Sequence, residues 1–191
     1  MTLPNKPEVG SGNVPATGLG AMGFPGPTLG LWHVLHTKSR QEKVVAKDLA
    51  ALGIGSFLPV QQQLRYYGKR KFVIDEPMFP GYVFLRGSRD QAYAIDRTKR
   101  IVSIIDVVDQ VRLDWELRNL ALALSSGTHL DPYPYLTEGT RVEVKSGPLR
   151  GLQGFVQGRS AKLNRLILKV DILGQAVAVE IDGSLLEPLR E

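Results

Sequence analysis

The stretch Met78–Leu85, "MFPGYVFL", decides where one strand of the fold begins and what its two faces carry. Pro80 cannot donate a hydrogen bond to a strand ladder and Gly81 tolerates unusual backbone dihedral angles, so we expect the strand to begin near Tyr82. Side chains alternate between the faces of a strand, which places Tyr82 and Phe84 on one face and the aliphatic residues on the other. The aliphatic face suits a hydrophobic core. The two aromatic side chains therefore need a cover, either a helix of the same chain or a partner.

The segments around this strand predict an α+β sandwich. Apolar residues at helical spacing predict a helix between Ser39, the first residue of a capping box, and Gly53, and a later helix capped by Asp114. Alternating and β-branched runs predict two strands that form a hairpin around Gly68. Helices and strands in this order pack as helices against an antiparallel sheet.

Composition shifts along the chain predict the domain organisation. Residues 1–30 hold repeated Gly and Pro with few large apolar residues, which predicts a disordered tail before a first domain at 31–128. Two prolines in "HLDPYPYL" predict a linker at 129–136. Residues 137–191 alternate apolar and polar residues between Gly and Pro corners, which predicts a small all-β barrel of roughly five strands.

Composition also excludes several classes of site. The chain has no cysteine, which excludes disulfides and thiolate chemistry, and its three histidines do not cluster with carboxylates at a ligand spacing. We therefore expect no metal, no cofactor and no enzymatic activity. The sequence has no apolar run of roughly 18 residues and no signal peptide, so we expect a cytoplasmic protein without membrane contact.

The net charge of +5 and the pI of about 9.5 indicate a polyanionic partner. Residues 31–128 hold fifteen Lys and Arg against ten Asp and Glu, whereas residues 137–191 hold eight against seven. Tyr66 and Tyr67 accompany the cations at the hairpin tip, a composition that suits phosphate contact as well as a solvated tip. The candidate nucleic-acid contacts are Lys38, Arg40, Lys43, Lys69, Arg70, Lys71 and Arg100.

Two motifs carry a family resemblance. "FPGYVFL" resembles the motif of the NusG amino-terminal domain, and "GTRVEVKSGPLRGLQGFV" resembles the KOW motif. Together they resemble the NusG family of transcription elongation factors over residues 31–191. Within the family, "GKRKFVIDEPMFPGYVFL" is more similar to the specialised RfaH-like antiterminators than to housekeeping NusG.

The resemblance implies a function for the first domain. Such a domain binds the clamp helices of RNA polymerase through an apolar pocket and suppresses pausing, with its basic residues towards upstream or non-template DNA. The pocket residues implied here are Phe79, Pro80, Tyr82 and Phe84. The alternative is that these aromatic residues are ordinary core.

The resemblance also implies that the KOW domain recruits a second partner, such as a small-subunit ribosomal protein or the termination factor Rho. Its implied contact residues are Leu149, Leu152, Ile172, Leu173 and Gly174. The competing hypothesis, a ribosome-associated RNA-binding KOW protein, predicts a basic excess in residues 137–191, where the sequence has almost none.

The linker prolines and the nearly neutral KOW segment predict two domains that tumble semi-independently. We also expect the protein to be a monomer. The alternative is a closed form in which the KOW segment refolds as helices and covers Tyr82 and Phe84.

Overall fold

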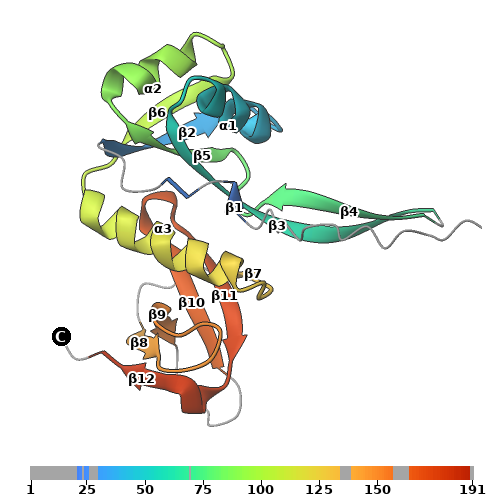
Figure 1. Cartoon of the computed structure of the whole chain (residues 1–191), viewed down its shortest axis with the longest axis vertical. Helices are drawn as coiled ribbons and strands as arrows, with labels where there is room; N and C mark the ends of the chain where they lie inside the picture. Colours follow the sequence, from blue (N-terminus) through green and yellow to red (C-terminus); the bar gives the residue numbers. More distant parts are fainter. Residues whose placement is uncertain are drawn as a thin grey trace, which may run out of the picture.

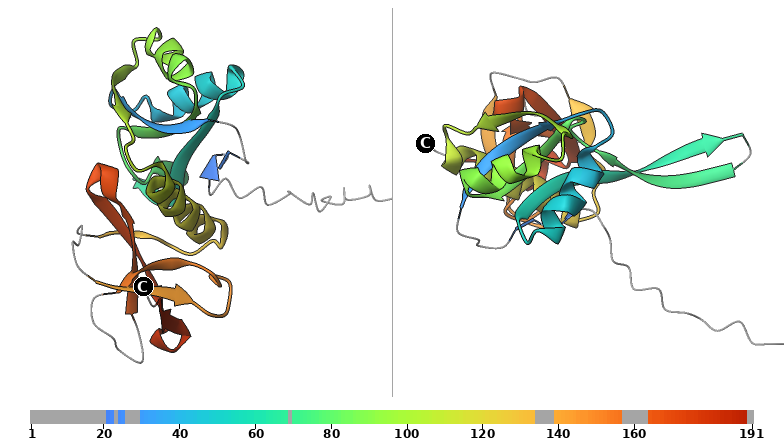
Figure 2. Two further views of the ribbon diagram at one scale, coloured as in Figure 1. Left: turned by 90° about the vertical axis from the view of Figure 1, so that its left-hand side faces the viewer. Right: turned by 90° about the horizontal axis from the view of Figure 1, so that it is seen from above.

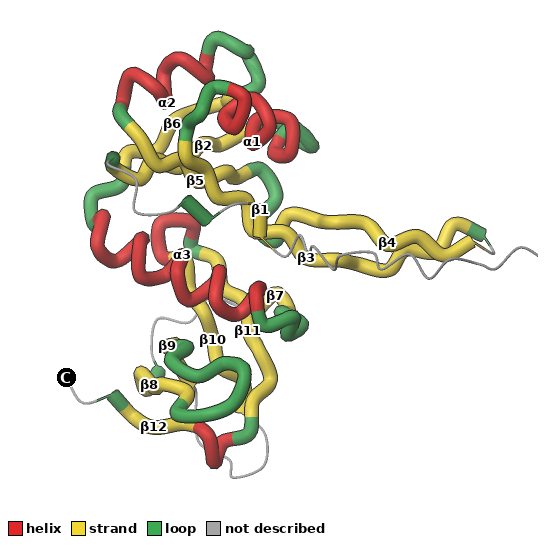
Figure 3. The backbone as a smooth tube through the Cα atoms, viewed as in Figure 1, coloured by secondary structure: helices red, strands yellow, loops and turns green. Residues whose placement is uncertain are grey.

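Two antiparallel sheets lie on either side of helix α3 (Gln110–Ser125), one above it and one below it in Figure 1. The computed structural model describes residues 21–22, 24–25, 30–68, 70–133, 139–156 and 164–189. The same layers are visible in Figure 3, where the two shorter helices lie on the side of the first sheet away from α3. No helix in these ranges is long and apolar enough to span a membrane.

The first sheet has the strand order β1-β3-β5-β2-β6, and β4 pairs with β3 outside this order. Helices α1 and α2 cover one of its faces, and α3 covers the other. The elements are β1 (Ala21–Met22), β2 (Leu31–Thr37), α1 (Glu42–Ala51), β3 (Gly55–Tyr67), β4 (Arg70–Pro77), β5 (Tyr82–Gly87), α2 (Arg89–Asp96) and β6 (Ile101–Asp106).

Strand β5 starts at Tyr82, as the Pro-Gly pair predicted. Gly81 has a φ of 87°, a left-handed conformation that favours glycine over residues with a Cβ. Beyond this turn the side chains alternate as expected. Val83 and Leu85 are fully buried under α1 and α2, and Phe84 is fully buried on the opposite face, under α3.

Helix α3 begins earlier than the sequence predicted. Its N-cap is Asp109, whose side chain accepts a hydrogen bond from the Arg112 N–H at 2.9 Å. The predicted cap, Asp114, is wrong because this residue lies inside the helix. Its carboxylate instead accepts from Trp32 Nε1 at 3.0 Å and from Arg86 at 2.9 Å, which ties α3 to strands β2 and β5.

Part of the predicted disordered tail belongs to the fold. Strand β1 pairs with β3 through Ala21↔Pro59 and Met22↔Leu58. The Phe24 ring centroid then lies 5.2 Å from the Phe57 ring centroid. An aromatic side chain can bury enough apolar surface to order a short segment, so the prediction for residues 1–30 fails at 21–22 and at Phe24. Residues 1–20 lie outside the described residues.

The predicted linker also joins the fold. Leu130 is buried, its N–H donates to Gln61 Oε1 at 2.9 Å, and residues Asp131–Tyr133 form β7 on the edge of β11. The backbone groups of this short segment find partners on both domains, so it does not act as a free tether. The rest of the predicted linker, residues 134–136, lies outside the described residues.

The second sheet has the order β12-β8-β9-β10-β11-β7. Among the described residues no pairing joins β12 to β7, so the predicted barrel is a six-stranded sheet here. A Cβ on Gly154 would lie 2.7 Å from the Ile167 carbonyl oxygen, so the close approach of β9 and β10 requires glycine. The elements are β8 (Thr140–Val144), β9 (Gln153–Val156), β10 (Asn164–Val170), η1 (Asp171–Leu173), β11 (Gln175–Ile181), η2 (Gly183–Leu185) and β12 (Leu186–Pro188).

Candidate binding faces at the domain junction

The implied polymerase-binding residues divide into a buried pair and an accessible pair. Phe79 and Phe84 are 2% and 0% exposed, and their ring centroids lie 6.5 Å apart in an edge-to-face arrangement. Tyr82 is half-buried and Pro80 is exposed. Tyr82 and Phe84 therefore share a face of the sheet, as predicted, but α3 covers Phe84 and leaves Tyr82 at the rim of that face.

The rim around Tyr82 is built by loops that meet at one end of the sheet. The Tyr82 ring stacks on His36 of the neighbouring strand, with centroids 5.1 Å apart and an angle of 21° between the rings. Gly81 N–H donates to Glu42 Oε1 at 2.6 Å, and the Thr37 N–H donates to the Gly81 carbonyl at 2.7 Å. These bonds fix the turn that presents Tyr82.

Several of the candidate nucleic-acid contacts converge on this rim. The Lys38 N–H donates to the Arg100 carbonyl at 2.8 Å, which places these two residues side by side. Arg40 is exposed in the same loop, and Lys43 follows on the first turn of α1. The Arg100 guanidinium lies 3.2 Å from Asp48, so its charge is partly used within the domain.

The other candidate contacts are on the hairpin of β3 and β4, which stands out from the rest of the molecule (Figure 2, right). Arg70 and Lys71 are exposed near its tip, and Lys69 lies outside the described residues. The sequence therefore predicted one basic set, but the structure separates it into a rim group and a hairpin group.

The implied KOW contact residues also divide. Leu149 and Leu152 are 7% and 0% exposed, inside the cluster that continues from the second sheet to α3. Ile172 and Leu173 of η1 are partly buried against the same cluster, and Gly174 follows with a φ of 59°. Only the η1 loop thus offers an accessible part of the predicted surface.

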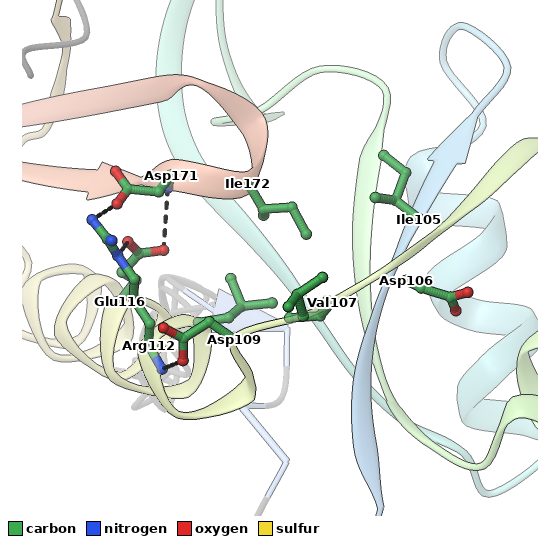
Figure 4. A pocket seen from close by; sticks show the side chains of 10 residues that line it. Ile105, Asp106, Val107, Asp109, Arg112, Glu116, Asp171 and Ile172 are labelled. Carbon is green, nitrogen blue, oxygen red and sulfur yellow. Dashed lines mark hydrogen bonds and ion pairs between the residues drawn. The ribbon is translucent and has the colours of Figure 1, made fainter.

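The η1 loop reaches the first domain (Figure 4). Ile172 lines a cleft of about 350 Å³ together with Ile105, Val107 and Leu113. In this conformation the predicted face of each domain is turned towards the other domain. One hydrophobic cluster runs through both domains in this structure, whereas the expectation of semi-independent domains stays a prediction about motion in solution.

Polar contacts hold α3 against the second sheet, and the sequence prediction missed them. Asn119 Oδ1 accepts from the Gln153 N–H at 2.7 Å, and Trp115 Nε1 donates to Gln153 Oε1 at 3.1 Å. These side chains lie on the helix face opposite the leucine row, a face that reads as solvated in the sequence. The tryptophan was the available signal that this face is also covered.

Glu116 is the most deeply buried charged group of this contact, at 3% exposed. Its Oε2 accepts from the Asp171 N–H at 3.2 Å and its Oε1 accepts from Arg112 Nε at 3.3 Å, while Arg112 also pairs with the Asp171 carboxylate. Burial raises the pKa of Glu116 to about 7, against the opposing effect of Arg112. Burial likewise lowers the pKa of Lys169, on the facing strand β10.

The junction has the features of a binding surface. Among the described residues no group of three or more His, Asp or Glu side chains could hold a metal ion. The junction offers aromatic and aliphatic side chains for contact, with cations at the rim.

Comparison with known protein families gives a match over most of the first sheet. The family described as "Transcription termination factor nusG" matches residues 30–114. Those residues resemble a NusG domain. The match covers β2 to the first turn of α3, which includes the Tyr82 rim and the hairpin. The assignment of the second sheet as a KOW domain stays a prediction from its motif.

The relatives found cover most of the chain. The "Transcription termination/antitermination protein NusG" of Pseudomonas aeruginosa is 25% identical over 175 residues, which cover 82% of this chain and 97% of that protein. A solved structure described as "Domain interaction in Thermotoga maritima NusG" is 20% identical and covers 84% of this chain and 97% of its own, with a TM-score of 0.42. The "Crystal Structure of MjSpt4:Spt5 complex conformation B" is 14% identical, covers 84% and 98%, and has a TM-score of 0.30.

Proposed function

We propose that this chain is a transcription elongation and antitermination factor of the RfaH-like kind. Its NusG domain binds the clamp helices of RNA polymerase and suppresses pausing, and its second domain recruits a further partner. The observation that carries the proposal is the NusG match over residues 30–114 together with the accessible Tyr82 rim inside that range.

The rim suits a protein helix better than the buried part of the face does. Stacked on His36, Tyr82 is a preoriented aromatic residue, and aromatic residues are frequent anchors of protein interfaces. The exposed Pro80 and the apolar side chain of Met78 extend the same edge. Contact with Phe84 itself would require α3 to move away from the sheet.

A factor held on the polymerase clamp would act by differential binding. If it binds the closed clamp more tightly than the open one, it shifts the population away from the open, paused state. No chemical step is needed. The rim cations Lys38, Arg40 and Arg100 and the hairpin cations are then directed towards the nucleic acid of the elongation complex.

The proposal predicts a difference between two aromatic substitutions. Tyr82→Ala should weaken binding to purified RNA polymerase by about tenfold or more while the fold stays intact, because the residue lies at an accessible rim. Phe84→Ala should instead destabilise the domain by about 3–5 kcal/mol, because the ring is fully buried. Affinity from biolayer interferometry and stability from urea unfolding separate the two effects.

Tyr93→Ala is the matched control. Tyr93 is an exposed tyrosine of the same domain, on α2, and contacts Arg89. This variant should bind polymerase as the parent does and leave pausing suppression unchanged on a pausing template. The proposal is overturned if Tyr82→Ala binds as tightly as Tyr93→Ala.

A further inference from the structure

The hairpin of β3 and β4 leaves the body of the domain as a two-stranded ribbon (Figure 2, right). Among the described residues β4 pairs only with β3, so its outer edge has no strand partner. Three large apolar side chains are exposed along the ribbon, with Leu64 at 43%, Phe72 at 45% and Val73 at 61%. An isolated two-stranded ribbon is marginally stable in water, and an unpaired edge with apolar side chains is a template for another strand.

The sequence of β4 is complementary to itself in reverse. It reads "RKFVIDE" over residues 70–76, with two cations at one end, two carboxylates at the other and three apolar residues between them. Antiparallel pairing centred on Val73 places Arg70 opposite Glu76 and Lys71 opposite Asp75. A shift by one residue in either direction sets a charged residue opposite an apolar one, either Lys71 opposite Ile74 or Asp75 opposite Phe72.

We propose that β4 pairs antiparallel with β4 of a second copy of this chain, about a twofold axis at Val73. The two hairpins then form one four-stranded sheet, in which the free β4 edge of each copy is paired. A twofold interface requires a surface that complements itself, and "RKFVIDE" satisfies that requirement in both charge and hydrophobicity.

Side chains from all four strands support this register. Leu64 lies opposite Val73 within one hairpin, and cross-strand partners share a face of the sheet. In the pair of hairpins the row Leu64, Val73, Val73, Leu64 therefore runs across the whole face. On the other face Phe72 meets Ile74 of the second copy.

The charged side chains of β4 can form ion pairs with the second copy. Within the described residues neither Lys71 nor Asp75 has an ion-pair partner. Glu76 is already paired with Arg65, but both of the Arg65 hydrogen bonds, of 3.1 and 2.6 Å, go to Oε1. Oε2 is left for Arg70 of the second copy.

A second copy fits this edge better than a nucleic acid does. A phosphate backbone would meet the carboxylates of Asp75 and Glu76 along half of the strand, whereas a second β4 meets them with cations. Pairing would engage Arg70 and Lys71, so dimer formation and the proposed contact of the hairpin tip with nucleic acid exclude each other. A single strand pair buries less surface than a standard interface of about 1,600 Å², so the dimer is weak.

A cysteine at the axis tests the register directly, because the chain has no other cysteine. Opposed residues of antiparallel strands have Cα atoms about 4.5–5.5 Å apart, within the usual range for a disulfide. Val73→Cys in the full chain should form a covalent dimer under mild oxidation at micromolar concentration. The control is Val102→Cys on the edge strand β6, which is similarly exposed, at 57%, and lacks the charge pattern. Equal crosslinking of the two variants, or none in either, overturns the proposal.

Charge reversal tests the pairing without a covalent trap. Lys71→Asp places a carboxylate opposite Asp75 of the second copy, on both sides of the twofold axis. The repulsion should weaken the dimer about tenfold in sedimentation equilibrium. Adding Asp75→Lys restores both the pairs and the net charge, and should restore the dimer. Lys47→Asp, on an exposed position of α1, has the same net charge as Lys71→Asp and should dimerise as the parent does. A monomer at all concentrations, or a double variant no better than Lys71→Asp, overturns the proposal.

Discussion

At the residue scale, the most informative group is Glu116, which links the two domains through a buried carboxyl. It lies on α3 and accepts a backbone hydrogen bond from Asp171 of the second domain. Four charged groups surround it, namely Arg112 and Asp109 from α3 and its cap, Asp171 from η1, and Lys169 from β10. Because burial dominates over Arg112, the pKa of Glu116 rises to about 7 in the folded protein.

The raised pKa of Glu116 predicts a pH-dependent stability. The folded protein holds the proton more tightly than the unfolded chain, so this stabilisation is fully present below the unfolded pKa of roughly 4.3 and is lost as pH rises through about 7. It is on the order of 3 kcal/mol. Urea unfolding at intervals from pH 4 to pH 8 measures it.

Glu116→Gln is the control for this prediction, because it keeps the shape of the neutral acid without its titration. The difference in stability between parent and variant should change across this interval and level off above about pH 7. Parallel curves for the two proteins would show that Glu116 does not titrate in the interval.

At the element scale, the hairpin of β3 and β4 is the element with the most exposed surface. The pairing of β3 with β4 places Tyr66 opposite Lys71. Tyr66 is 67% exposed, so an accessible aromatic ring lies beside a cation. Aromatic stacking with bases and ion pairing with phosphates are the usual means of binding single strands.

The hairpin cations predict a salt-dependent interaction with nucleic acid. Changing Lys69, Arg70 and Lys71 to Gln should lower the slope of log affinity against log salt by roughly one unit for each phosphate that the hairpin no longer neutralises. The measurement uses an elongation complex with an exposed non-template strand, at protein concentrations where the chain is monomeric.

Lys145→Gln with Arg150→Gln is the control for the hairpin, since both residues are exposed on the second domain. The slope of log affinity against log salt for this control should equal that of the parent. If the hairpin variant also has the parent's slope, the tip cations do not contact nucleic acid.

Helix α3 is the second element of interest, because it has two buried faces. Its leucines cover Phe84 and the first sheet, and its polar face binds the second sheet through Asn119 and Trp115. A movement of α3 away from the first sheet would therefore uncover Phe84.

At the scale of the whole molecule, the shared hydrophobic cluster predicts joint motion of the domains. ¹⁵N relaxation of the full chain should give one rotational correlation time for residues 31–128 and 139–189. Backbone shifts should be those of strands over Asn164–Val170 and Gln175–Ile181.

A variant with Trp115→Ala and Asn119→Ala should give a different correlation time for each domain, because it removes the hydrogen bonds to Gln153. Two separate times in the parent would mean that the domains already move independently in solution. Helical shifts in the second domain would support the refolded alternative.

The sequence by itself determined the local features of the first domain. The Pro-Gly pair fixed the start of β5, and alternation put Val83 and Leu85 under α1 and α2, because these outcomes depend on dihedral preferences and a period of two. Turn residues and apolar runs likewise located the hairpin. The motif "FPGYVFL" indicated a resemblance to NusG, and the family match covers the same residues.

Only the tertiary structure decided what covers each face. Periodicity shows that a face is apolar, but it does not say which distant segment packs on it. Phe84 was thus open to assignment as a partner contact until α3 was seen to cover it, and Asp114 was assigned to a cap until Trp32 and Arg86 were seen to bind it. Phe24 packs against the core from the predicted tail, and Leu130 is buried in it from the predicted linker. Their burial depends on contacts far apart in the chain, and local sequence patterns carry no information about those contacts.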